Sequence, residues 1–256
     1  MGKSLKKVIS FSILSMVVFL TGLIGLIFFP QSLFANKFEH GKFNIYYDHQ
    51  IDSKTAAEIL DQTYAIIQKS ELFHSKKQFD IYLSHGNFMD LIENLQGKGP
   101  YARATAGNIF IKIPTSFHEE TFQYGKNLVK MPELLAHEII HNLQAYHYGL
   151  WNFSPWKHPP MWKVEGYPEY ISRVSILDKK DYDLKKEVRQ LKAELSESAN
   201  GLVKITTDYY APAVYYKGRL MIEYLMQIEH LNYHEILEDQ RSEEEVYKTL
   251  LDWAEK

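Results

Sequence analysis

The chain has 256 residues, of which 45% are hydrophobic and 24% charged, with a formal net charge of −3 and no cysteine. This composition is typical of a globular protein with a sizeable core, and its charge balance does not favour nucleic acid as a partner. The lack of cysteine excludes disulfides, thiolate metal sites and cysteine nucleophiles, so any bound metal must be held by nitrogen and oxygen.

The N-terminal segment predicts a membrane anchor. Three lysines within the first seven residues precede an uncharged apolar run over 8–29, which ends at Pro30. A helix of about 20 such residues spans a bilayer core, whereas the apolar part of a secretory signal has about 7 to 15. Leu33 also stands where a cleavage site needs a small residue. We therefore expect residues 1–36 to be a cytoplasmic stub and an uncleaved single-pass signal-anchor, with the rest of the chain outside the cytoplasmic membrane. A cleaved signal peptide is the alternative, and it leaves the outer location unchanged.

Residues 37–256 are expected to form one α+β domain in two halves. The half over 37–130 contains period-two segments rich in aromatic and β-branched residues, which predict a small mixed sheet, and the half over 131–256 has helical spacing almost throughout. The first helix has Ser53 or Asp52 as its N-cap. Strands are predicted over 42–48, 78–84 and 107–113, and helices over 53–73, 88–95, 132–148, 160–177, 181–198, 212–229 and 242–254.

The stretch "PELLAHEIIHNLQAYHYGLW" (132–151) contains an H-E-x-x-H motif on the first helix of the second half. Residues four apart share one face of a helix, so His137 and His141 can present their imidazoles to one ion. Glu138 lies one step around the same helix. A catalytic zinc site needs a third protein ligand, because three ligands leave one position for water.

His147 stands where the metzincin pattern H-E-x-x-H-x-x-G-x-x-H has its last histidine. The glycine of that pattern lets the chain leave the helix, but here the position holds Gln144, which favours a helix. If the helix runs on to Tyr148, His147 points about 120° away from His141. We therefore expect His147 not to be a ligand.

Glu165 is the better candidate for the third ligand. It follows His141 by 24 positions and starts a segment with helical spacing. A helix antiparallel to the first would return its carboxylate to the two imidazoles. Glu169 lies on the same face one turn further, where it could accept the second N–H of His137 and fix the orientation of that ring. His158, in the loop between the two helices, has no spacing that connects it with the histidine pair.

These motifs together resemble the gluzincin zinc peptidases. "HEIIH" followed by "MWKVEGYPEY" is similar to their H-E-x-x-H and W-x-x-E-G-x-x-x-Y-like segments. The resemblance implies a peptidase MA-like domain whose zinc site lies between the two halves. It makes His137, His141 and Glu165 the Zn²⁺ ligands, Glu138 the general base and Glu169 the outer carboxylate. Pro168 departs from the pattern and could redirect Glu169 by kinking the helix.

A third segment, "VYYKGRLMIEYL" (214–225), is similar to the Y-x-K-G segment of the zinc aminopeptidases. In that segment the tyrosine donates to the oxyanion, which implies this role for Tyr215, with Tyr216 as the fallback. Those aminopeptidases also hold the substrate's amine with an acidic residue near a strand. The strand predicted over 107–113 has no acid nearby, since none occurs between Ala102 and Pro114, and this favours an endopeptidase-like enzyme.

The sequence therefore predicts a membrane-anchored zinc metallopeptidase that acts on peptide or protein substrates, without a nucleic-acid partner. The strand over 107–113 is either a sheet edge that pairs with an extended substrate or an ordinary inner strand. Two other functions stay open: a catalytically inactive zinc- or peptide-binding member of the same fold, and a membrane-tethered interaction module without metal.

Overall fold

The structure is a computed structural model of the whole chain. It describes residues 2–84, 90, 93–94, 102–112, 120–124, 127–154, 157–197, 202–206 and 209–256. It is a mixed α+β structure, 59% helical, with one five-stranded sheet, which confirms the predicted class. The short helix predicted over 88–95 lies largely outside the described residues.

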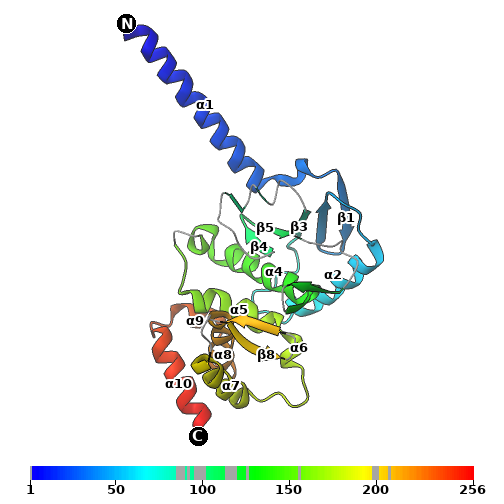
Figure 1. Cartoon of the computed structure of the whole chain (residues 1–256), viewed down its shortest axis with the longest axis vertical. Coiled ribbons are helices and arrows are strands. Elements are labelled where there is room, and N and C mark those ends of the chain that lie inside the picture. Colours follow the sequence, from blue (N-terminus) through cyan, green and yellow to red (C-terminus); the bar gives the residue numbers. More distant parts are fainter. Residues whose placement is uncertain are drawn as a thin grey trace.

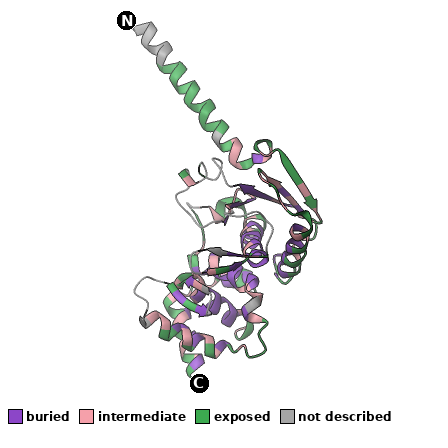
Figure 2. Ribbon diagram, turned by 45° about the vertical axis from the view of Figure 1, so that its right-hand side comes forward, coloured by how far each residue is buried: buried purple, intermediate pink, exposed green. Residues whose placement is uncertain are grey.

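The N-terminal helix α1 (Gly2–Phe28) extends away from the rest of the molecule, and its described side chains are mostly exposed (Figures 1 and 2). Its part over Ile9–Phe28 has a mean hydropathy of 2.5 and is long and apolar enough to cross a membrane. By length and composition alone, an N-terminal signal sequence can meet the same criteria. A short 3-10 helix, η1 (Pro30–Leu33), connects α1 to the sheet.

The five strands of the sheet have the order β1-β2-β3-β5-β4. Strands β2, β3 and β5 are parallel, and β1 and β4 pair antiparallel at the edges. The segment predicted over 107–113 is therefore an inner strand, and β4 is the edge strand among the described residues. The bounds are β1 (Asn36–His40), β2 (Phe43–Tyr47), β3 (Phe79–Ser84), β4 (Ala102–Thr105) and β5 (Asn108–Lys112).

Alternation along the inner strands gives the sheet two different faces. Ile45, Ile81 and Ile109 are aligned across β2, β3 and β5 and are fully buried in the main core. The opposite face carries a smaller aromatic cluster, described below. The main core joins this face of the sheet to helices α2 (Ser53–Ile67) and α4 (Met131–Tyr148).

Helix α2 starts where expected and ends earlier than predicted. The side chain of Asp52 accepts the N–H groups of Lys54 and Thr55, which makes Asp52 the N-cap. The helix was expected to continue to 73 but ends at Ile67. The chain turns there because Ser70 hydrogen-bonds the Tyr167 hydroxyl at 2.9 Å, and this contact holds the turn against the second half.

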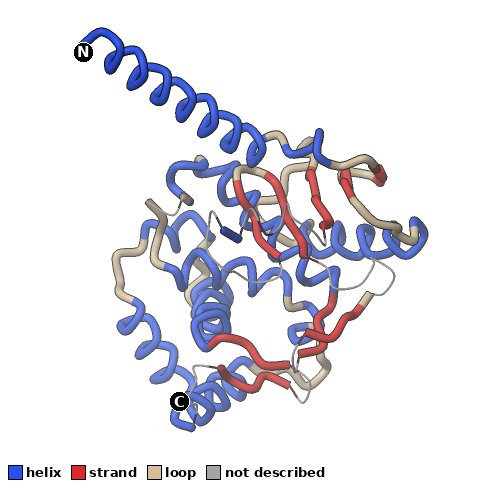
Figure 3. The backbone as a smooth tube through the Cα atoms, turned by 45° about the horizontal axis from the view of Figure 1, so that its top comes forward, coloured by secondary structure: helices blue, strands red, loops and turns tan. Residues whose placement is uncertain are grey.

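The helices of the second half pack below the sheet, and within the described part of the chain each half carries one hairpin outside the five-stranded sheet (Figure 3). The predicted helix over 160–177 is two helices, because Arg173 leaves the helical conformation. The half is also less helical than predicted, since residues after 201 form a hairpin from β-branched and aromatic residues. The elements are β6 (Thr121–Tyr124), β7 (Asn127–Lys130), η2 (Leu150–Phe153), α5 (Met161–Ser172), α6 (Val174–Leu177), α7 (Leu184–Glu197), β8 (Leu202–Thr206), β9 (Tyr209–Pro212), α8 (Ala213–Gln227), α9 (Tyr233–Glu238) and α10 (Glu243–Glu255).

Candidate metal centre

Helices α4 and α5 run antiparallel and face each other with paired side chains. Three contacts follow one another along them: His141 with Glu165, His137 with Glu169, and Glu133 with Arg173. Residue numbers rise along α4 while they fall along α5, which is the antiparallel arrangement expected from the sequence. The spacing of four residues places one pair on each helical turn.

The donor atoms of His137, His141 and Glu165 meet at one point. The two Nε2 atoms are 3.1 Å apart, and Oε2 of Glu165 lies 3.4 Å from Nε2 of His137 and 3.2 Å from Nε2 of His141. A tetrahedral zinc ion with ligands at about 2.0 to 2.1 Å requires separations of about 3.3 Å between its ligand atoms. The three atoms therefore fit one face of a zinc coordination tetrahedron.

The hydrogen bonds behind the two rings determine which nitrogen faces the centre. Nδ1 of His137 lies 3.1 Å from the Glu169 carboxylate, and Nδ1 of His141 lies 2.9 Å from Oε1 of Gln144. Both partners are acceptors, so each Nδ1 carries the proton and each Nε2 presents a lone pair. Two lone pairs and a carboxylate oxygen within 3.1–3.4 Å repel one another unless a proton or a cation lies between them.

The charges around the centre favour a cation. Burial alone would lower the pKa of His137, but Glu165 and Glu169 outweigh it and raise that pKa to about 10. The pKa of His141 is also raised against the effect of burial, mainly by Glu165. Burial would raise the pKa of Glu165, yet the two imidazoles hold it well below its usual value. All three pKa shifts show that a positive charge is favoured at the point where the donor atoms meet.

The orientation of Gln144 is fixed by its amide nitrogen. Nε2 donates to the carbonyl oxygen of Val164 at 3.0 Å and to the hydroxyl of Tyr233 at 2.6 Å, so Oε1 must face His141. The Val164 carbonyl is available because Pro168, four residues later, has no N–H to donate to it. Pro168 therefore leaves α5 unbroken and frees the acceptor that holds Gln144.

Glu169 is held from its other side by Arg173. Nε of Arg173 lies 2.5 Å from Oε1 of Glu169, and its Nη1 lies 3.5 Å from Glu133. Burial would raise the pKa of Glu169, but Arg173 and His137 lower it to about 2, so the carboxylate is ionised. The direction of Glu169, which Pro168 had put in question, is toward His137 as the sequence predicts.

Glu138 is buried beside the centre and faces the edge strand. It is 6% exposed, and the backbone N–H of Ala104 on β4 hydrogen-bonds its carboxylate. Burial raises the pKa of Glu138, and the nearby imidazoles and the Ala104 N–H offset only part of that effect. A carboxylate whose pKa is raised is a stronger base than an exposed one, which suits Glu138 to accept a proton.

The structure separates the two candidate tyrosines. The rings of Tyr215 and His137 have centroids 6.2 Å apart, whereas the hydroxyl of the fully buried Tyr216 donates to Glu187, within the core. A close crossing of α5 and α8 sets this position. A Cβ at Gly166 would lie 2.6 Å from the backbone of Gly218, so only glycines permit the approach.

The two further histidines weighed as ligands, His147 and His158, lie away from the centre. Helix α4 continues to Tyr148, and Nε2 of His147 contacts the carbonyl oxygen of Leu72 at 2.8 Å, away from the centre. Nδ1 of the exposed His158 contacts its neighbour Pro159.

Sequence reasoning missed the partners that orient the ligands. Gln144 was considered only as a helix former, although it follows His141 by three residues and so lies on the same face. Arg173 follows Glu169 by four residues, which is the spacing of a helical ion pair. These spacings were visible, but many surface residues share them.

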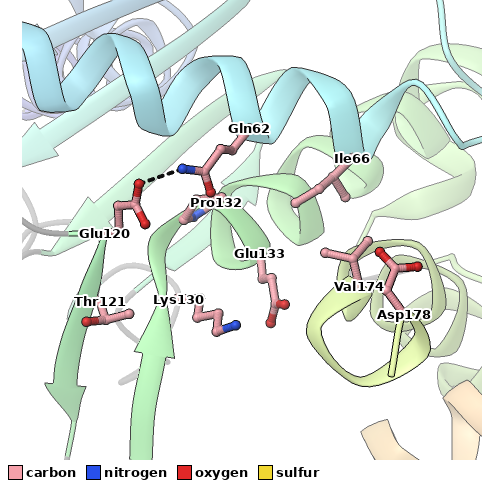
Figure 4. Close-up of a pocket in the computed structure, with 9 residues that line it drawn as sticks. All are labelled: Gln62, Ile66, Glu120, Thr121, Lys130, Pro132, Glu133, Val174 and Asp178. Carbon is pink, nitrogen blue, oxygen red and sulfur yellow. Dashed lines mark hydrogen bonds between the residues drawn. The ribbon is translucent and has the colours of Figure 1, made fainter. Parts of the chain in front are cut away.

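A cavity of about 310 Å³ opens at the N-terminal end of α4 (Figure 4). Glu133 projects into the cavity. Ion pairs connect Glu133 to Arg173, Arg173 to Glu169, and Glu169 to His137, so the cavity is linked to the candidate centre through this series of contacts. None of the three donor residues lines it, so it is distinct from the metal centre. It is lined by Gln62, Ile66, Glu120, Thr121, Lys130, Pro132, Glu133, Val174 and Asp178.

Comparison of the chain with protein-family models, with curated proteins and with solved structures found no match. The resemblance of its motifs to gluzincin peptidases therefore stays a prediction.

Proposed function

We propose that the protein is a membrane-anchored zinc metallopeptidase that hydrolyses peptide bonds outside the cytoplasmic membrane. The observation that carries this proposal is the convergence of two imidazole lone pairs and one carboxylate oxygen at tetrahedral spacing, with Glu138 beside them. The domain would be peptidase MA-like, with the centre between the sheet-containing half and the helical half.

In this proposal, the residues at and around the centre have separate roles in binding the ion and in catalysis. His137, His141 and Glu165 hold the ion, and Glu169 and Gln144 keep the two imidazoles in the tautomer that binds it. A Zn²⁺ bound there supplies the Lewis acidity that makes water a nucleophile near neutral pH. Tyr215, whose ring centroid is 6.2 Å from that of His137, would donate its O–H to the oxygen of the scissile carbonyl.

Glu138 moves the proton. It takes one proton from the attacking water, whose oxygen bonds to the carbonyl carbon, and delivers it to the nitrogen as the C–N bond breaks. The product acid carries the second proton of the water and gives it to the amine or to solvent, so the products are a carboxylate and an ammonium group, and the carboxylate of Glu138 is regenerated. The described part of the chain places no acidic side chain on β4 or β5, which supports an endopeptidase-like specificity over the binding of a free N-terminal amine.

The test is hydrolysis of a fluorogenic peptide library by the full chain in detergent, beside Glu138→Gln. We expect zinc to bind both proteins and only the wild type to hydrolyse. Stoichiometric zinc without any hydrolysis by the wild type would indicate an inactive zinc-binding protein. A wild type that purifies without metal, and that zinc does not saturate, would indicate an interaction module.

A further inference from the structure

The C-terminal end of α1 is hydrogen-bonded to the sheet. Nδ2 of Asn108, the first residue of β5, donates to the carbonyl oxygens of Ile27 at 2.9 Å and Phe28 at 3.2 Å. The last carbonyls of a helix have no partner within the helix, so Asn108 caps α1 from another part of the chain. The apolar helix thus ends directly on the β4–β5 hairpin.

The covalent junction between α1 and the sheet is short and packed. The N–H of Phe29 still donates to Gly25, η1 begins at the next residue, and the ring of Phe34 packs on Tyr82 at 5.3 Å. Tyr82 is fully buried in an aromatic cluster on the outer face of the sheet, where Tyr46 and Phe110 stack on it. Between Phe28 and β1 no flexible linker separates α1 from the domain.

The β4–β5 hairpin also contacts helix α4, which carries His137, Glu138 and His141. The N–H of Ala104 bonds Glu138, and Nδ2 of Asn142 donates to the carbonyl oxygen of Gly107. Ala106 and Gly107 have φ of 53° and 84°, as a two-residue hairpin turn requires, so Thr105 pairs with Asn108. Residues 104–108 therefore connect the end of α1 with the proposed base.

These contacts limit the distance between the base and the foot of α1. The path runs from the Glu138 carboxylate to the N–H of Ala104, across the paired strands β4 and β5 to Asn108, and along the Asn108 side chain to α1. By these steps the Glu138 carboxylate lies on the order of 15 Å from the last carbonyls of α1. The apolar segment has 20 residues and is about 30 Å long, which matches the hydrocarbon core. The headgroup layer adds about 5 to 8 Å on each side. In a membrane, the site would therefore lie within about 10 Å of the headgroups.

We propose that the substrates are membrane-tethered polypeptides, which the enzyme cuts within about 5 to 10 residues of the bilayer. An extended chain covers about 3.3 Å per residue, so about 5 residues are enough to reach from the hydrocarbon boundary to Glu138. This inference rests on the proposed peptidase function and on α1 spanning a membrane.

The test uses the full chain in liposomes with zinc and one cleavable peptide in several forms. The peptide is free, or is joined to an apolar membrane-spanning helix through Gly/Ser spacers of about 5, 10, 20 and 40 residues. We expect the fastest cleavage at about 5 to 10 residues and a fall of about tenfold at 40, because the local concentration of a tethered site falls with spacer length. Equal rates for short and long spacers would overturn the inference.

A second experiment uses a variant of the enzyme that stays anchored in the membrane but in which the catalytic domain is no longer held at a fixed distance from it. A flexible linker of about 20 residues between Phe29 and Pro30 keeps Phe34 on Tyr82, and Asn108→Ala in the same variant removes the donor to the last carbonyls of α1, so the domain can move by about 25 Å relative to α1. We expect it to hydrolyse the free peptide as the wild type does and to lose the preference for short spacers. The matched control carries the same linker between the exposed Lys180 and Asp181, and it should keep the wild-type profile.

The outcomes distinguish the two proposals. Failure to cut any peptide, free or tethered, overturns the peptidase function and this inference with it. Hydrolysis that does not depend on the spacer, or a linker variant that keeps the short-spacer preference, overturns this inference alone.

Discussion

The two histidines of the candidate centre are held by different chemistry. His137 donates to an ionised carboxylate, Glu169, which Arg173 holds in turn, whereas His141 donates to a neutral amide, Gln144. A charged acceptor strengthens the hydrogen bond and makes the ring a better electron donor, while a neutral acceptor mainly fixes its orientation. The comparison teaches that two histidines four residues apart on one helix can have different basicities, because each has a different hydrogen-bond partner.

The largest effect should come from Glu165, the candidate ligand whose carboxylate lies close to both histidines. Glu165→Ala removes the oxygen that lies 3.2 Å and 3.4 Å from the two Nε2 atoms, and it leaves the two imidazoles alone. We expect zinc affinity to fall by more than about 100-fold and hydrolysis to be lost, as measured by competition with a chromogenic chelator. Retention of wild-type affinity would mean that another residue completes the site.

The next effect tests the charged side of the comparison. Glu169→Gln leaves an amide to accept from His137 and removes the negative partner of Arg173, at a site that is 1% exposed. We expect zinc affinity to fall by about 100-fold. Because the change also breaks a buried ion pair, unfolding free energy should fall by about 3 kcal/mol in urea titrations of the metal-free protein. An unchanged affinity would remove Glu169 from the account.

The neutral side should be less sensitive. Gln144→Ala takes away the acceptor of the His141 Nδ1 proton but no charge. We expect zinc affinity to fall by about tenfold, measured in the same competition assay. His147→Ala is the matched control on the same helix, since His147 contacts Leu72 instead, and it should bind zinc as the wild type does. A loss from Gln144→Ala as large as that from Glu169→Gln would contradict the comparison.

The smallest effect concerns the carbonyl that holds Gln144. Pro168→Ala restores an N–H that can bond the Val164 carbonyl within α5, in competition with the Gln144 amide. We expect zinc affinity to fall by about twofold, because only part of one hydrogen bond is lost. Combined with Gln144→Ala, it should have no further effect, since both changes act through the same amide. Additive losses in this double-mutant cycle would show that Pro168 acts by another route.

Periodicity predicted the parts of the molecule that depend on local pattern. The strands at Phe43–Tyr47 and Phe79–Ser84 lie in period-two segments rich in aromatic and β-branched residues, and the helix over Met131–Tyr148 has both a proline at its start and a glycine after its end. Strands β1 and β4 and the β6–β7 and β8–β9 hairpins were missed. Segments of four or five residues carry too little pattern to be distinguished from loops.

The candidate site shows the same division. His137, His141, Glu165 and Glu169 were predicted because helical spacing fixes which side chains share a face, and the structure brings them together. The link from Pro168 through Val164 to Gln144 could not be predicted. It depends on how α4 and α5 are aligned along each other, and this alignment is decided by tertiary packing and not by the local pattern.

The central claim is that His137, His141 and Glu165 bind one ion together. The most direct measurement is the zinc content of the purified full chain, with X-ray absorption at the zinc edge to identify the ligands. The account predicts stoichiometric zinc with two imidazoles and oxygen ligands at about 2.0 to 2.1 Å, retained in His147→Ala and lost in Glu165→Ala. A wild type without zinc, or zinc that is lost with His147 and kept without Glu165, would contradict it.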